Sequence, residues 1–189
     1  MRIAVIDWET GGLDPAMSAL FEFGYVMGET ARPTNQLLAT GRIIVPQEYN
    51  NRTSRYVSQS TLKWWIEETM KSSELGQHTV ETLELASKGF IGSFQTKLEK
   101  FMYELNQHQI EGIFCTDKSF DHAILLAVCH DLNIHFPLSY KQCFETRYMS
   151  SIQAPGCFDK RDAIGPIVHT AQDDALLLYN SLCCYLNTP

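Results

Sequence analysis

The first ten residues constrain the fold more than any other stretch of the chain. Residues 2–7 read R-I-A-V-I-D, a short apolar run that predicts a β-strand buried on both faces. Side chains two positions apart on a strand point the same way, so Asp7 and Glu9 are expected to project together from the strand's C-terminal end. The T-G-G sequence that follows then ends the strand.

Two carboxylates on one face repel each other unless a cation lies between them or one of them takes up a proton. Hard oxygen ligands at an open strand end favour Mg²⁺ or Mn²⁺ over zinc. A solvated acidic strand end is the ordinary explanation of a single D-x-E sequence. The rest of the chain has to decide between the two explanations.

Composition sets the broad class of the protein. At 189 residues, the chain is expected to form one domain, residues 1–189, with a substantial core. No apolar stretch approaches the roughly 20 residues that a membrane span requires, so no membrane partner is expected. The residues before Asp7 are too few for a signal peptide. Six scattered cysteines without a C-x-x-C pair favour reduced thiols and a cytoplasmic protein over a disulfide framework or a zinc site.

The formal net charge of −7 limits how this chain can bind nucleic acid. A protein that grips long duplexes through electrostatics is usually basic. The charge therefore argues against a large non-specific footprint. An acidic nucleic-acid enzyme stays open, provided that divalent metals neutralise its site and that it contacts only a few nucleotides.

The hydrophobic pattern predicts a mixture of strands and helices. Three strands come first, with Gly24 as a candidate bulge and short turns that suit an antiparallel meander. The expected strands are residues 2–7, 20–27, 37–45, 110–116 and 141–145, and the expected helices are residues 61–71, 92–108, 120–132 and 170–186. Residues 47–58 and 153–168 are interpreted as loops, residues 146–152 as one or two helical turns, and residues 72–88 are left open.

Helical periodicity assigns faces to the two middle helices of interest. On the helix 61–71 it places Trp65 inward with Leu62 and Ile66, and it leaves Trp64 more exposed. On the helix 120–132, Asp121 lies at the start of a stripe that is otherwise apolar. An unpaired charge there would be costly, so a partner or a metal is needed beside Asp121.

The last expected helix brings a further acid and a histidine. Its buried stripe is expected to contain Ala171, Ala175, Leu178, Leu182 and Tyr185. Asp174 lies one turn into the helix beside that stripe, and His169 stands just before the helix. Each feature alone is weak, because acids in a first turn are already favoured by the helix dipole.

The order of these features along the chain is far more specific than any one of them. D-W-E-T-G-G from Asp7, S-F-D ending at Asp121, and H-x-x-x-x-D from His169 to Asp174 resemble the three motifs of the DnaQ-like, DEDDh 3′–5′ exonucleases. The resemblance spans nearly the whole chain. The sequences W-W at 64–65 and E-T-R at 145–147 are most similar to the phage and prophage branch that includes the DexA-like exodeoxyribonucleases.

That resemblance implies an α/β protein with an RNase H-like fold, a mixed five-stranded sheet flanked by helices. It also implies that Asp7, Glu9, Asp121 and Asp174 hold two divalent cations, Mg²⁺ or Mn²⁺, with Asp7 bridging both. Two cations roughly 3.5–4 Å apart can activate the attacking water and stabilise the departing 3′-oxygen together. His169 would take the proton from that water, which suits an imidazole that titrates near neutrality.

The resemblance further implies how the end of a strand is sensed. Thr10 with nearby backbone N–H groups would contact the terminal 3′-OH, and Leu13 would pack against the last bases. Phe120 and Trp65 would help to shape the nucleotide pocket, since stacking on aromatic rings tolerates any base. Core packing is an equally good explanation of both aromatic residues.

Two positions depart from the usual pattern of the family. Trp8, inside the D-W-E sequence, is bulkier than the usual occupant and is expected to lie on the helix-covered face, away from the acids. Asp117 adds an acid to the loop before Asp121, where it could disturb contacts to the substrate.

The predicted function is a two-metal-dependent 3′–5′ exonuclease that hydrolyses terminal phosphodiester bonds of single-stranded DNA and releases nucleoside monophosphates. Its partner would be the 3′ end of a single strand. An exoribonuclease of the oligoribonuclease or RNase T kind fits the charge and the small footprint equally well. A non-catalytic interaction module would have lost an acid or the histidine, and none is missing. An RNase H-like endonuclease would lack the histidine that precedes the last acid.

Overall fold

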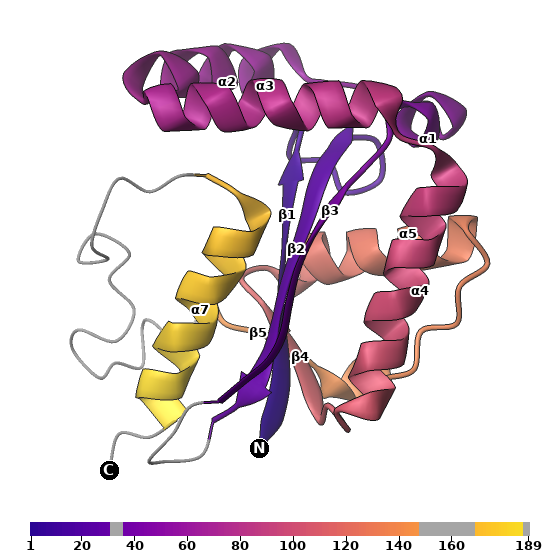
Figure 1. Ribbon diagram of the computed structural model, residues 1–189, viewed down its shortest axis with the longest axis vertical. Coiled ribbons are helices and arrows are strands. Elements are labelled where there is room, and N and C mark those ends of the chain that lie inside the picture. The colour runs from indigo at the N-terminus through magenta and orange to yellow at the C-terminus, as the bar shows by residue number, and fades with distance from the viewer. Residues whose placement is uncertain (31–35, 148–168, 187–189) are drawn as a thin grey trace.

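A mixed five-stranded sheet forms the centre of the molecule (Figure 1). Its strand order is β3 (Gln36–Ile44), β2 (Leu20–Glu29), β1 (Arg2–Thr10), β4 (Gly112–Cys115) and β5 (Cys143–Glu145). The first three strands are antiparallel neighbours, whereas β4 and β5 continue the sheet in parallel with β1. The predicted sheet is thus confirmed. The computed structural model describes residues 1–30, 36–147 and 169–186. The expectations for residues 148–168, which include Cys157, lie outside this range.

Strand β1 is buried on both faces, as its sequence predicts. Ala4, Ile6 and Trp8 face a large hydrophobic cluster that also contains residues of α4 (Ile91–Gln107) and α5 (Ala123–Asp131). Ile3 and Val5 point the other way, into a second cluster formed with α7 (Ala171–Leu186). Figure 1 shows α7 on one side of the sheet and α4 with α5 on the other. The alternation of side chains along one strand therefore defines the two layers that cover the sheet.

Trp8 lies where it was expected, on the face covered by α4. Its ring packs against Phe23 with ring centroids 4.6 Å apart, and the residue is almost fully buried. The bulk of Trp8 thus contributes to the core and leaves the opposite face of β1 to Asp7 and Glu9.

Three further helices lie at one end of the sheet, α1 (Gln47–Arg52), α2 (Gln59–Lys71) and α3 (Ser73–Lys88) (Figure 1). The prediction of a loop over residues 47–58 is wrong at α1. This helix is too short for a periodic signal, and it is held by Tyr49, which is buried and donates its hydroxyl to Asp131 Oδ2 at 2.8 Å. Residues 72–88, which were left open, form α3.

Helix α2 begins after Ser58, whose side chain accepts a hydrogen bond from the Thr61 N–H. The predicted inward stripe is only partly right. Trp65 is half-buried, but Leu62 and Ile66 are 51% and 52% exposed. Helix α2 has no fully buried residue and packs on α3 at the end of the sheet, so Leu62 and Ile66 lie outside both core clusters.

Gly24 is not a bulge, contrary to the prediction. It pairs in regular register with Asp7 on one side and with Arg42 on the other. The irregularities in the pairing lie instead between Glu9 and Thr10 and between Met27 and Gly28.

Two short turns, one before α5 and one before β5, were not predicted from the sequence. A π-helical turn, η1 (Lys118–His122), precedes α5, so Asp121 lies on this wide turn. Single π-turns occur often at functional sites. A short 3₁₀ turn, η2 (Tyr140–Gln142), leads into β5.

The buried stripe of α7 comprises Ala171, Ala175, Tyr179, Leu182 and Cys183. Leu178 is half-buried and packs against the same cluster, so its prediction is partly right, whereas the half-buried Tyr185 does not belong to the stripe. The prediction of reduced thiols is wrong for one described cysteine. Cys184 takes part in a disulfide, whereas Cys115, Cys129, Cys143 and Cys183 are free and buried.

Within the three described ranges, no helix is long and apolar enough to cross a membrane.

Candidate metal centre and nucleotide pocket

The site lies where β1 extends past the end of its neighbour β4. Strand β4 pairs with β1 only at Ile3–Val5, whereas the antiparallel pairing with β2 continues beyond that point. Asp7 and Glu9 follow Ile3 and Val5 on the face that α7 covers, because side chains of odd number share one face of this strand. Both acids therefore project toward the N-terminal turn of α7.

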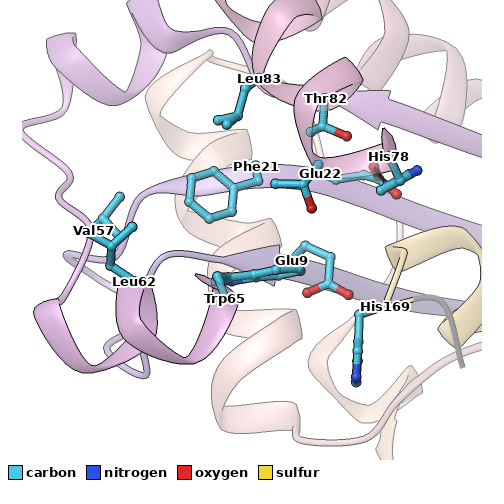
Figure 2. A pocket seen from close by; sticks show the side chains of 11 residues that line it. Glu9, Phe21, Glu22, Val57, Leu62, Trp65, His78, Thr82, Leu83 and His169 are labelled. Carbon is cyan, nitrogen blue, oxygen red and sulfur yellow. Dashed lines mark hydrogen bonds and ion pairs between the residues drawn. The ribbon is translucent and has the colours of Figure 1, made fainter. Parts of the chain in front are cut away.

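That turn supplies the next two residues of the site. His169 precedes α7 and Asp174 lies in its first turn, where Thr170 Oγ1 accepts a hydrogen bond from the Asp173 N–H at 3.1 Å. The ligand atoms of Glu9, His169 and Asp174 lie within 4.8 Å of one another. Figure 2 shows a cavity lined by Glu9, Glu22 and His169, in which the Glu9 carboxylate is directed toward the side on which His169 lies. Residues from opposite ends of the chain thus meet at one point.

Asp121 approaches the same strand from the opposite side. The residue is 4% exposed, and its carboxylate accepts a hydrogen bond from the Asp117 N–H at 3.3 Å. Burial raises the pKa of Asp121 to about 7, although hydrogen bonds from the backbones of Asp117 and Trp8 act against this shift. The backbone of Trp8, which donates one of these hydrogen bonds, lies between Asp7 and Glu9 in the chain. The Asp121 carboxylate is therefore beside the backbone of the two strand acids. The predicted need for a partner here has a physical basis, since metal-free Asp121 resists ionisation.

Asp117, the extra acid in the loop before Asp121, binds Ser119 and Arg147. It accepts hydrogen bonds from the backbone N–H and the hydroxyl of Ser119, and it forms an ion pair with Arg147. Partial burial raises its pKa, but these hydrogen bonds and the Arg147 charge outweigh burial and lower the pKa below its ordinary value. Asp117 is therefore an ionised carboxylate whose charge is balanced by Arg147.

A pocket of about 410 Å³ opens beside Glu9. Thr10 and Leu13 line it from the end of β1, and Trp64 and Trp65 line it from α2. Leu13 is 92% exposed, so its side chain is available to a ligand rather than to the core. Thr10 and Leu13 thus line one pocket together with Glu9.

The two tryptophans have different roles in the walls of the pocket. Trp65 donates its indole N–H to the Thr10 carbonyl at 3.4 Å and links α2 to β1. Trp64 is 40% exposed and its ring packs edge-on at 5.2 Å from the ring of His169. Sequence periodicity placed Trp64 correctly as the more exposed of the two but did not select it as a site residue. A large aromatic side chain that periodicity leaves off the inward stripe was the signal available.

Phe120 lies elsewhere. It is half-buried against the core cluster that α4 and α5 cover, and it does not line the pocket that contains Thr10 and Leu13. Its surroundings favour the core-packing explanation that the sequence left open.

The donor set suits a hard divalent cation. Glu9 and Asp174 offer carboxylate oxygens at half-buried positions, and the imidazole of His169 lies within the same small volume. Asp7 precedes Glu9 by two residues on β1, and Asp121 of η1 accepts a hydrogen bond from the Trp8 backbone between them, but neither acid belongs to the group formed by Glu9, His169 and Asp174. An oxygen-rich set of this kind favours Mg²⁺ or Mn²⁺, whereas zinc and copper sites carry more nitrogen and sulfur.

The sequence matches no known family profile and no curated protein. Solved structures are nevertheless similar to it. The nuclease domain of 3′hExo, a DEDDh family member, bound to rAMP, has a TM-score of 0.61 and 16% sequence identity, over 98% of this chain and 91% of that chain. The cell-death related nuclease 4 (CRN-4) has a TM-score of 0.55 and 16% identity, over 98% of this chain and 64% of that chain.

These likenesses show the fold. The chain has the RNase H-like exonuclease fold, a mixed five-stranded sheet flanked by helices. The particular arrangement seen here sets Glu9, His169 and Asp174 together at one end of the central strand.

Proposed function

We propose that residues 1–189 form a metal-dependent 3′–5′ exonuclease of the DnaQ-like, DEDDh kind that releases nucleoside monophosphates from single-stranded DNA. The observation that carries the proposal is the convergence of Glu9, His169 and Asp174 to within 4.8 Å, in a fold shared with a DEDDh nuclease domain. The sequence order of the acids agrees with this assignment, and the DexA-like features of the sequence support DNA as the substrate.

Five residues would carry the reaction. Asp7, Glu9, Asp121 and Asp174 would hold two divalent cations. When bound, these ions neutralise the phosphodiester and stabilise the charge that builds up during hydrolysis. His169 would accept the proton of the attacking water, and its edge-on contact with the Trp64 ring supports a fixed orientation of the imidazole.

The pocket beside Glu9 would select a free strand end. Thr10 would contact the terminal 3′-OH, and a base would lie between the exposed Leu13 and the ring of Trp64. Trp65 would support this pocket through its bond to the Thr10 carbonyl. A pocket of about 410 Å³ accommodates an unpaired terminal nucleotide, and the net charge of −7 agrees with such a short contact.

Ribonucleotide substrates form the second candidate. The 3′hExo nuclease domain, with the same fold, is bound to rAMP, which favours an exoribonuclease activity for this chain as the alternative. The two candidates share every residue named above and differ only in the sugar that the pocket accepts.

One experiment tests both. The purified protein is incubated with end-labelled single strands of DNA and of RNA, with Mg²⁺ or Mn²⁺, and the products are separated by size. We expect 5′-labelled DNA to shorten stepwise from its 3′ end, and faster cleavage of RNA would select the alternative. Absence of mononucleotide release from both strands would refute the proposal, as would efficient cutting of circular DNA.

The matched pair Asp174→Asn and Asp173→Asn assigns the site. Both acids lie in the first turn of α7, but only Asp174 belongs to the group that includes Glu9 and His169. Asp174→Asn should lose at least a hundredfold in kcat, whereas Asp173→Asn should stay near the wild-type value. Equal activity in the two variants would remove Asp174 from the site.

A further inference from the structure

Glu22 is a buried carboxylate that the proposed reaction does not use. It pairs with Glu9 across strands β1 and β2 and is 1% exposed. Its Oε2 atom lies 2.6 Å from Arg42 Nε of strand β3 and 3.1 Å from His78 Nε2 of helix α3. Figure 2 shows Glu22 beside His78 and Thr82, on the wall of the cavity that Glu9 also lines.

The other oxygen of Glu22 reaches the start of α7. Glu22 Oε1 accepts a hydrogen bond from the backbone N–H of Ala171, the first residue of that helix, at 3.1 Å. The first N–H groups of a helix have no partner within the helix, and a carboxylate satisfies one of them while complementing the helix dipole. One side chain thus connects two neighbouring elements of the fold to the turn that carries His169 and Asp174.

Arg42 and His78 hold this carboxylate in place and in its charged form. Arg42 donates to Thr82 Oγ1 at 2.6 Å and lies 3.2 Å from His78 Nε2, so the guanidinium is fixed on several sides. Burial alone would raise the pKa of Glu22. The hydrogen bonds from His78 and Arg42 outweigh burial and hold that pKa below its ordinary value.

The rest of α7 is attached to the sheet by different means. Ala175, Tyr179 and Leu182 pack into the hydrophobic cluster beneath the sheet and hold the body of the helix. Glu22 acts only at the first turn. Loss of its charge should therefore loosen that turn without detaching the helix.

We propose that Glu22, fixed by Arg42 and His78, is a positioning residue that sets the first turn of α7 so that His169 and Asp174 meet Glu9. The expected change in kcat rests on the proposed exonuclease function. The effect of Glu22 on metal affinity can be measured without any nuclease activity. Residues that orient the groups around a metal typically change affinity or activity by about 10–100-fold when they are replaced.

The test compares Glu22→Gln with Glu29→Gln. Glu29 is on the same strand and pairs with Arg2 Nε at 2.7 Å, so the control removes the same chemistry at the far end of β2. For Glu22→Gln we expect kcat to fall by about 10–100-fold and the Mn²⁺ dissociation constant, measured by electron paramagnetic resonance, to rise by about tenfold. KM for the oligonucleotide should stay within about twofold, because Thr10, Leu13 and Trp64 are untouched.

Several outcomes decide the matter. If kcat and Mn²⁺ affinity of Glu22→Gln equal those of Glu29→Gln, the positioning role is overturned. Should Glu22→Gln not fold, Arg42→Gln takes its place, because it leaves Glu22 with His78 and should lower kcat and Mn²⁺ affinity in the same direction. If wild-type protein and Glu29→Gln degrade no nucleic acid, the exonuclease function fails, but the difference in Mn²⁺ affinity still tests Glu22.

Discussion

Gly24 of strand β2 lies directly against Ala171, the first residue of helix α7. A Cβ atom added to Gly24 would come closer than 3.0 Å to the carbonyl group of Ala171 and to the amide nitrogen of Gln172. Gly24 also pairs with Asp7 on β1. The missing side chain therefore allows the N-terminal turn of α7 to rest on the sheet beside the first acid of the site.

Replacing Gly24 with alanine should push that turn away from the strand. We expect Gly24→Ala to lower the free energy of unfolding by about 1–3 kcal/mol, the usual penalty of overpacking, and to reduce kcat by at least tenfold. Urea denaturation and a single-strand cleavage assay measure the two effects. Gly92→Ala is the control, because nothing lies within 4 Å of its added Cβ in α4 and alanine is the better helix former. A Gly24→Ala protein as stable and active as the control would contradict this account.

Asp121 makes the stability of the metal-free protein depend on pH. Its pKa in the folded state is about 7, above its ordinary value of 3.8, so the folded protein binds the proton more tightly than the unfolded chain. This stabilisation is complete below about pH 4 and is lost as pH rises through about 7. Asp121→Asn should remove this loss and be more stable than the wild type by about 1–3 kcal/mol at pH 8, although inactive.

Chemical denaturation in EDTA at pH 5 and pH 8 checks this prediction. Asp173→Asn, which replaces an exposed acid of α7, should change stability by only a few tenths of a kcal/mol at either pH. A stability difference between Asp121→Asn and the wild type that does not change with pH would show that Asp121 titrates normally.

Chelation should abolish activity and lower stability together. Ligand atoms of Glu9 and Asp174 lie within 4.8 Å of each other, and Asp7 shares a face of β1 with Glu9, so a bound cation relieves the repulsion among these carboxylates. Mn²⁺ at about 100 times its dissociation constant should raise the free energy of unfolding by about 2.7 kcal/mol, and EDTA should reverse this rise. Calorimetric melting with Mn²⁺, Mg²⁺, Ca²⁺ and EDTA measures the shift. The variant Asp174→Asn should show a much smaller response, and an equal response would place the cation elsewhere.

Leu13 should affect substrate binding but not folding. Its side chain is almost fully exposed and lines the pocket beside Glu9, so Leu13→Ala should leave the melting temperature unchanged. Loss of its apolar contact with a terminal base should raise KM by roughly 5–30-fold, equivalent to about 1–2 kcal/mol of buried apolar surface. Leu85→Ala is the matched control, since Leu85 is also exposed but lies on α3 outside this pocket. Equal KM values for the two variants would exclude Leu13 from the binding site.

The sequence predicted most where structure is local. Alternation along residues 2–9 placed Asp7 and Glu9 on one face of a buried strand, and helical spacing placed Asp121 on a core-facing stripe; both predictions agree with the structure. It failed at α1, where a helix of six residues is held by the Tyr49–Asp131 hydrogen bond. It also failed at the apolar side of α2, where Leu62 and Ile66 have no core to meet.

What the sequence alone determined is therefore all five strands, the longer periodic helices and the acids near their ends, because strand and helix periods depend on neighbouring residues. Only the tertiary structure decided that Gly24 admits α7, that Glu22 caps its first residue and that Trp64 packs on His169. Each of these contacts joins residues far apart in the chain. No local period records such contacts, because they depend on how the whole chain folds.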